Sequence, residues 1–359
     1  MKITIVGGGN IGTQFAVHCA EAGHDVKMFT STPQMFEHHL MIVGENGEIT
    51  HEGDISLATN DPDTAFREAE LIFITMPPTQ MEWIAQTITQ NIGSAPMIGV
   101  VPGNGGWECA FRACIERGCV FFGIERVPAI ARLVRKGKTV RSVGYRSELH
   151  VASLPASRVG KCCEIIQSVF GIPTCPIPSY LNLTMTPSNP ILHTTRLRTI
   201  FRDWHPGVIY DYVPLFYEEW DDASSTLLIA CDEEVQEICR QLPEFQLGYV
   251  KSLRIHYESP TVEDMTRKIS SITAFKGLPT PAVKTDEGYI PDLQSRYFTA
   301  DFSYGLSVIQ QIARLTGIST PNIDATILWY KKIAVSVKEF SYAAYGIRTR
   351  NELEQFYLQ

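Results

Sequence analysis

The chain has 359 residues, which is enough for two domains with separate hydrophobic cores. Its apolar content of 44% and charged content of 19% are typical of a globular protein. The formal net charge of −8 argues against nucleic acid or an anionic membrane as the main partner, although a small anionic ligand can still bind at a locally basic site.

Targeting and metal signals are missing from the sequence. No stretch reaches the roughly 18 apolar residues that a membrane span needs, and the start, residues 1–6, predicts a strand rather than a signal peptide. The nine cysteines show no paired metal-ligand spacing. We therefore expect free thiols, no metal site and a cytoplasmic protein.

A glycine motif directly follows the first predicted strand. Gly7, Gly9 and Gly12 fill the pattern G-x-G-x-x-G, and a helix that ends before Gly23 follows. Gly7 allows a tight turn, Gly9 lets the backbone approach a pyrophosphate, and Gly12 permits close packing of helix on strand. Strand, motif, helix and strand in this order predict a dinucleotide-binding Rossmann domain.

The cofactor residues follow from this prediction. The free amides at the helix start, at Asn10 and Ile11, would hold the phosphates. The second strand, residues 25–30, ends in Thr30 and Ser31, where NAD enzymes usually carry an acid. A carboxylate would repel a 2′-phosphate and hydroxyls can donate to it, so we expect NAD(P)H, with NADP slightly favoured.

Strands and helices continue to alternate up to residue 123, which predicts a parallel sheet covered on both faces. The loops after the strands that end at Thr75 and Val101 should meet the cofactor, so Met76 and Pro77 join the predicted cofactor site. Residues 138–154 are expected to add strands to the same sheet.

A proline-rich stretch at 172–178 ends this part of the chain. We place the Rossmann domain at 1–179 and a helical substrate domain at 180–359, because the apolar period changes from 2 to 3.6 residues. The predicted helices of this all-α domain are 190–202, 222–242, 261–273, 305–316 and 322–343. A Rossmann domain followed by an all-α domain resembles the 6-phosphogluconate dehydrogenase-like two-domain architecture.

Two stretches of the second half carry candidate catalytic groups. Ser188 or Asn189 is expected to cap a helix, with Pro190 in its first position and His193 about one turn inside. A histidine near the positive end of a helix needs a carboxylate partner to accept a proton near neutral pH. The alternative is a histidine that only packs in the core.

The second stretch is residues 295–306, which is rich in aromatic residues. Arg296 could hold a substrate carboxylate through paired hydrogen bonds, and Asp301 could orient and charge-balance a histidine. The alternative is a structural ion pair between Arg296 and Asp301.

Together these motifs resemble the octopine/nopaline (opine) dehydrogenase family, including its bacterial N-(1-carboxyethyl)norvaline type. The resemblance rests on the glycine motif, on Asn189 to His193, on Arg296-Tyr297-x-x-x-Asp301, and on residues 320–324. It implies reduction of the imine of an amino acid and a 2-keto acid such as pyruvate, in a cleft between a Rossmann and a helical domain.

By motif position the resemblance makes His193 the acid/base and Asp301 its partner, with Arg296 and Asn189 binding substrate. The implied partners are these small molecules, and a homodimer is compatible with the sequence. One alternative is a ketopantoate reductase-like enzyme. Such enzymes usually rely on a lysine at the start of the helical domain, but no lysine lies between Lys161 and Lys251. A second alternative is an NAD(P)-binding sensor without turnover.

Overall fold

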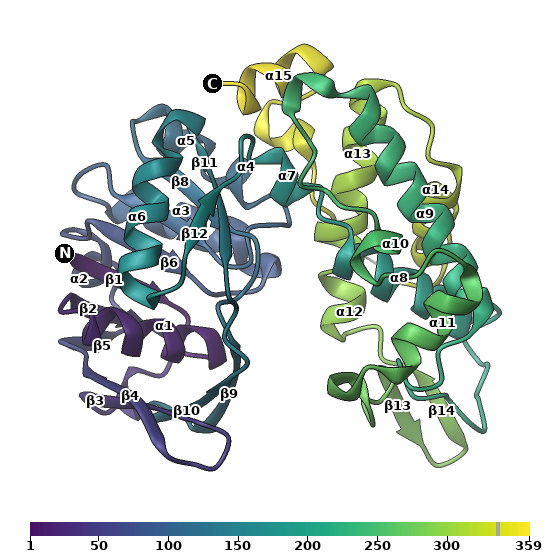
Figure 1. The fold of residues 1–359 in the computed structure, drawn as a ribbon, viewed down its shortest axis with the longest axis horizontal. Helices are drawn as coiled ribbons and strands as arrows, with labels where there is room; N and C mark the ends of the chain where they lie inside the picture. The colour runs from purple at the N-terminus through teal and green to yellow at the C-terminus, as the bar shows by residue number, and fades with distance from the viewer. Residues whose placement is uncertain (335–337) are drawn as a thin grey trace. The chain divides into compact units, whose positions relative to one another are not determined.

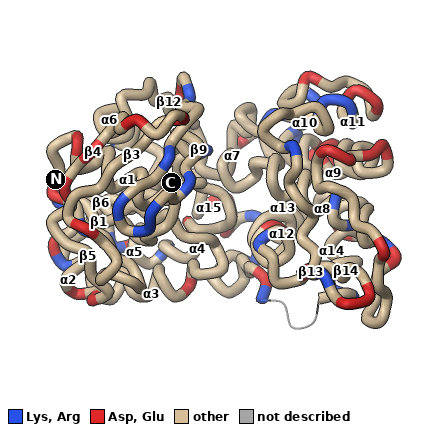
Figure 2. The backbone as a smooth tube through the Cα atoms, turned by 90° about the horizontal axis from the view of Figure 1, so that it is seen from below, with Lys and Arg blue, Asp and Glu red and all other residues tan. Residues whose placement is uncertain are grey.

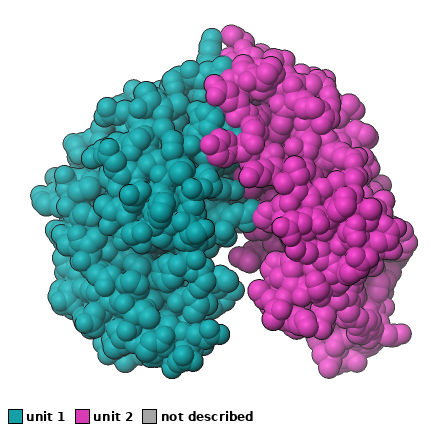
Figure 3. All heavy atoms as spheres, viewed as in Figure 1, with its two compact units in different colours: residues 1–183, 355–359 teal, residues 184–354 magenta. Residues whose placement is uncertain are grey.

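The computed structural model covers residues 1–359 and describes all of them except 335–337. The chain forms two compact units, residues 1–183 with 355–359 (unit 1) and residues 184–354 (unit 2) (Figure 3). The domain boundary proposed near residue 179 falls shortly before this division. The sequence did not indicate that the last residues of the chain pack with unit 1.

Unit 1 is built around an eight-stranded sheet in the order β12-β11-β8-β7-β6-β1-β2-β5 (Figure 1). The strands are β1 Lys2–Val6, β2 Asp25–Phe29, β5 Leu57–Thr59, β6 Leu71–Ile74, β7 Met97–Val100, β8 Val120–Ile124, β11 Leu149–Leu154 and β12 Thr174–Pro176. Val6 pairs with both Phe29 and Ile74, so β1 lies between β2 and β6. The strand order reverses at β1, and such a switch point is where open α/β sheets bind ligands.

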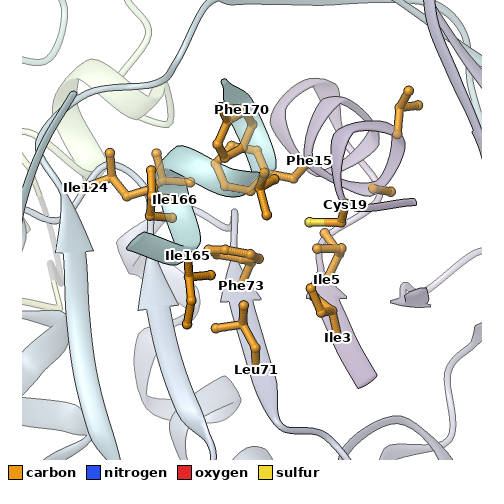
Figure 4. Close-up of a cluster of buried hydrophobic side chains, with 14 of the residues drawn as sticks. Ile3, Ile5, Phe15, Cys19, Leu71, Phe73, Ile124, Ile165, Ile166 and Phe170 are labelled. Carbon is orange, nitrogen blue, oxygen red and sulfur yellow. The ribbon is translucent and has the colours of Figure 1, made fainter. Parts of the chain in front are cut away.

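Helices cover both faces of this sheet. Helices α1 (Asn10–Glu21) and α6 (Val159–Phe170) pack on one face, where the Phe15 ring lies 5.1 Å from that of Phe73 and 4.7 Å from that of Phe170 (Figure 4). Helix α2 (Pro62–Phe66) packs on the other face, where Thr4 of β1 donates a hydrogen bond to the Ala65 carbonyl. The predicted doubly wound Rossmann-type sheet is therefore confirmed.

The remaining helices of unit 1 are short or follow the same alternation. They are α3 Met81–Asn91, α4 Trp107–Ala110, α5 Arg112–Glu116 and α7 Leu181–Thr184, the last of which ends in unit 2. Two strands depart from the predicted parallel arrangement, since β11 runs antiparallel to β8 and β12 runs parallel to β11.

A second sheet lies against α1, and the sequence did not predict it. It contains β3 His39–Val43, β4 Ile49–Asp54, β9 Ile130–Arg135 and β10 Thr139–Val143, in the order β4-β3-β10-β9. All four strands pack against α1. The expectation that residues 138–154 extend the main sheet is therefore wrong for β10, which pairs with β3 instead, and right only for β11.

Unit 2 is mainly helical, with α8 Ser188–Ile200, α9 Asp222–Gln241, α10 Leu253–His256, α11 Val262–Ser271, α12 Arg296–Thr299, α13 Ser307–Thr316, α14 Pro321–Ile333 and the start of α15 Arg350–Tyr357. Helix α8 packs against α9 and α14, and every residue from Pro190 to Leu197 is buried. The second domain predicted as helical is thus confirmed in its main elements (Figure 1).

Two details of unit 2 differ from the prediction. A hairpin of β13 (Ala282–Thr285) and β14 (Gly288–Pro291) interrupts the helices, so the domain is not purely α-helical. The helix predicted at 322–343 ends at Ile333, and residues 335–337 of that prediction lie outside the described residues.

Charged residues of both signs are spread along both units (Figure 2). Among the described residues, no helix is both long enough and apolar enough to cross a membrane.

Candidate active site

Helix α8 carries the histidine that the sequence singled out. The helix begins at Ser188, so Pro190 is its third residue, and no side chain caps it; the predicted cap by Ser188 or Asn189 is wrong. Proline still fits in the first turn, because the first backbone N–H groups of a helix have no partner within the helix. The start of α8 is held instead by close packing: a Cβ atom added at Gly305 would lie 2.9 Å from Cγ of Pro190.

His193 and Asp301 meet inside unit 2. The Nδ1 atom of His193 lies 2.7 Å from Oδ2 of Asp301, and the side chains are 5% and 18% exposed. Asp301 precedes a π-helical turn at Phe302–Leu306, closed by a hydrogen bond from the Leu306 N–H to the Asp301 carbonyl. Such turns often occur at functional sites, because they shift a side chain relative to a regular helix. The structure thus brings the two predicted catalytic residues together.

A third residue, Tyr217, completes the contacts of the imidazole. Its hydroxyl oxygen lies 2.8 Å from Nε2 of His193, and its side chain is buried. Burial, followed by the neighbouring Tyr297, raises the pKa of the Tyr217 phenol. Sequence reasoning missed Tyr217, which was considered only as one of several aromatic residues in 210–222. Its segment has no regular periodicity to show which way the side chain points.

Arg296 and His193 both contact the aromatic ring of Tyr297. The ring of Tyr297 has its centroid 4.3 Å from that of His193, and Cζ of Arg296 lies 5.4 Å from the same Tyr297 centroid. Asp301 is engaged by His193, and among the described residues no carboxylate forms an ion pair with the exposed guanidinium of Arg296. The structure therefore does not support the alternative of an Arg296–Asp301 ion pair. Arg296 retains its hydrogen-bond donors for a ligand.

Asn189 behaves differently from the other predicted substrate residues. It is the second residue of α8 and is exposed. Among the described residues, its side chain forms no hydrogen bond with His193, Asp301 or Arg296. Its assignment to substrate binding remains a prediction.

The glycine motif of unit 1 has the geometry that a pyrophosphate needs. Gly7 has a φ of +104°, and a Cβ atom at Gly12 would lie 1.7 Å from the Gly7 carbonyl oxygen. A Cβ atom at Gly9 would meet nothing within 4 Å, so the helix start opens on free space. Gly9 is the N-cap of α1 and supplies no capping side chain. The free amides there, including those of Asn10 and Ile11, suit a phosphate.

The other predicted cofactor residues differ in how close they lie to this turn. A Cβ atom at Gly7 would lie 3.0 Å from Cγ of Met76, and one at Gly8 would lie 2.9 Å from Oγ1 of Thr30, so both side chains line the turn. Ser31 and Pro77 are exposed beside them.

The side-chain oxygen of Asn10 is already engaged, because it accepts a hydrogen bond of 2.7 Å from the Leu133 N–H. The residues present fit the phosphates of a dinucleotide.

Known proteins share both halves of this arrangement. Residues 176–334 match the family model described as NAD/NADP octopine/nopaline dehydrogenase, alpha-helical domain, and residues 2–104 match that of the NAD-dependent glycerol-3-phosphate dehydrogenase N-terminus. The opine dehydrogenase of Haliotis discus hannai is 27% identical over 368 residues, which cover 92% of this chain and 90% of the relative.

Solved structures agree with the fold along nearly the whole chain. Octopine dehydrogenase with NADH and L-arginine has a TM-score of 0.84 at 21% identity, covering 99% of this chain and 98% of its own. The same enzyme with NADH and pyruvate has a TM-score of 0.81 at 22% identity, covering 98% and 97%. The helical-domain match contains both His193 and Asp301, and the relatives extend over the Rossmann sheet as well, so this chain is similar to opine dehydrogenases in both of its halves.

Proposed function

We propose that this protein is an NAD(P)-dependent oxidoreductase that acts on CH–NH bonds. It joins an amino acid to a 2-keto acid such as pyruvate and reduces the resulting imine to an N-(carboxyalkyl)amino acid, and it catalyses the reverse oxidation. The observation that carries this proposal is the His193–Asp301 pair beside an unpaired Arg296, with His193 and Arg296 in contact with the ring of Tyr297.

Each of these residues has a separate task. Arg296 binds the carboxylate of the keto acid, because a guanidinium offers paired donors that match carboxylate geometry. His193 supplies a proton to the keto oxygen as the amine adds, and removes one in the reverse direction. Asp301 holds the imidazole with its proton on Nδ1 and stabilises the imidazolium.

Unit 1 would hold the cofactor at the Gly7–Gly12 turn, and bound NAD(P)H supplies the hydride. The start of α1 would bind the pyrophosphate through backbone amides, while Thr30 and Met76 flank the turn. The octopine dehydrogenase structures with NADH, L-arginine and pyruvate support this assignment of ligand classes.

The cofactor preference and the location are narrower proposals. Thr30 and Ser31 place no carboxylate where the ribose 2′ position would lie, so we propose that NADPH binds slightly more tightly than NADH. Fluorescence titration of the purified protein with each nucleotide tests this order. All nine cysteines are free thiols, which supports a cytoplasmic enzyme.

The reaction is tested with purified protein, NADPH or NADH, pyruvate and a panel of amino acids that includes L-arginine. We expect loss of absorbance by the reduced nucleotide only when amine and keto acid are both present. Oxidation with a keto acid alone would instead identify a keto-acid reductase. Cofactor binding without turnover across the panel would favour the alternative of an NAD(P)-binding sensor.

A further inference from the structure

Both nitrogens of the His193 ring are hydrogen-bonded within unit 2. Nδ1 lies 2.7 Å from the Asp301 carboxylate and Nε2 lies 2.8 Å from the Tyr217 hydroxyl. A carboxylate only accepts hydrogen bonds, so Nδ1 is the donor in the first bond. Nε2 is therefore the nitrogen that exchanges a proton during turnover, and it faces Tyr217.

Packing holds Tyr217 in this position. Its ring stacks on Phe275, with centroids 4.3 Å apart and planes at 24°, and meets the edge of Phe216 at 4.8 Å. Only 4% of Tyr217 is exposed. Rotation of the phenol away from Nε2 would break this stack, so a substrate does not displace the hydroxyl without cost.

A buried arginine ties the Tyr217 segment to the helix that carries His193. Arg196 lies on α8 and is fully buried, and its guanidinium donates to the carbonyl oxygens of Phe216 at 3.0 Å and Glu219 at 2.6 Å. It also donates to the Asp221 carboxylate at 3.1 Å. These bonds fold the segment around Tyr217 back onto α8.

We propose that Tyr217 is a further catalytic residue, which passes the proton between His193 and the bound substrate. This proposal rests on the proposed function. In the reductive direction the Tyr217 O–H bond breaks as its proton bonds to the oxygen of the keto acid. In the same step the Nε2–H bond of the His193 imidazolium breaks, and its proton restores the phenol. Tyr217 ends neutral, His193 ends neutral, and the substrate oxygen has gained one proton.

The environment of Tyr217 suits such a relay. Because burial and Tyr297 raise the pKa of the phenol, it stays protonated before and after each transfer.

The test compares Tyr217→Phe with the wild-type enzyme in both reaction directions. The variant keeps the ring that stacks on Phe275 and loses only the hydroxyl. We expect kcat to fall by about 10²-fold to 10⁴-fold, the usual contribution of a positioned acid or base. Nucleotide affinity and the thermal unfolding midpoint should stay close to wild type. The solvent isotope effect should indicate two protons in flight in the wild type and one in the variant.

A matched control is Tyr330→Phe, which removes another hydroxyl from a side chain buried in unit 2 that packs on Phe302. Its kcat should remain close to that of the wild type. Unchanged or increased kcat in Tyr217→Phe, with an active wild type, would overturn the relay and leave the proposed function intact. A wild type that turns over no amine and keto acid pair refutes the proposed function and the relay together.

Discussion

Nδ1 of His193 lies 2.7 Å from Oδ2 of Asp301, although 108 residues separate the two along the chain. The contact determines which nitrogen of the imidazole carries the fixed proton, because the carboxylate accepts it from Nδ1. The opposite nitrogen, Nε2, is left to exchange protons. The substitution Asp301→Asn should reverse this arrangement.

In Asp301→Asn the amide can present an NH2 group to His193, which would move the ring proton from Nδ1 to Nε2 and prevent Nε2 from accepting one. We expect kcat for oxidation of the N-(carboxyalkyl)amino acid to fall by about 10²-fold to 10⁴-fold. Steady-state kinetics measures the fall in kcat, and an unchanged circular dichroism spectrum shows that the variant is folded. Asp286→Asn, in the exposed turn of the β13–β14 hairpin, makes the same substitution as a control. Equal activity in both variants would remove Asp301 from the mechanism.

Arg296→Gln removes the guanidinium proposed to bind the keto acid. A charged hydrogen bond contributes about 1.5–3 kcal/mol, so KM for pyruvate should rise by about 10-fold to 100-fold, while the Kd for the nucleotide stays the same. Arg296→Lys should recover only part of the loss, because an ammonium lacks the planar pair of donors. Arg267→Gln, on the exposed side of α11, is the control. If KM for pyruvate stays at the wild-type value in Arg296→Gln, the carboxylate binds elsewhere.

The two glycines of the cofactor turn should respond differently to alanine. Gly9 has a φ of −94° and open space at its Cβ position, so Gly9→Ala should fold normally and weaken nucleotide binding by intruding where the pyrophosphate passes. Gly12→Ala places a methyl group 1.7 Å from the Gly7 carbonyl and should lower the unfolding midpoint as well. Fluorescence titration and thermal unfolding separate the two effects. Gly160→Ala on α6, which meets nothing within 4 Å, is the control.

The features of this enzyme that its sequence predicted are those that depend on local patterns. The β1 strand, the glycine turn and α1 follow from short-range rules of packing and backbone conformation. The roles of His193, Arg296 and Asp301 were assigned from the resemblance of their motifs to those of opine dehydrogenases. The β3–β10 pairing was not predictable in this way, because Met41 and Thr139 meet only through the tertiary fold. Tyr217 was missed for the same reason: its direction depends on the contacts of Arg196 with nearby carbonyls.

The buried histidine of α1 gives unit 1 a pH dependence of known sign. Burial, followed by the charge of His51, lowers the pKa of His18 from 6.5 to about 3. The unfolded chain therefore binds a proton below pH 6.5 that the folded chain refuses. Stability linked to His18 is complete above about pH 6.5 and is lost as the pH falls toward 3, by about 1.4 kcal/mol per pH unit.

Thermal unfolding between pH 7 and pH 5 measures this loss. In His18→Gln, which offers an uncharged partner to the Tyr145 hydroxyl at 2.9 Å, the midpoint should fall less over the same range. Parallel curves for the two proteins would show that other groups determine the acid sensitivity.

Arg196 is expected to act as a positioning residue through Tyr217. Arg196→Met removes a fully buried guanidinium and leaves carbonyl oxygens of the 215–219 segment and the Asp221 carboxylate without their donor. Each buried carbonyl oxygen left without a donor costs about 1–3 kcal/mol of folding stability. Arg198→Met, two residues along the same helix, mainly breaks a bond of 2.8 Å to Thr326 and should cost less.

A double-mutant cycle separates positioning from stability. Arg196→Lys keeps the charge but cannot reach every acceptor, so kcat measured well below the unfolding midpoint should fall. Added to Tyr217→Phe, Arg196→Lys should cause little further loss of kcat, because the hydroxyl that Arg196 positions is already gone. Strictly multiplicative losses would mean that Arg196 influences the reaction without Tyr217, through the fold of α8 alone.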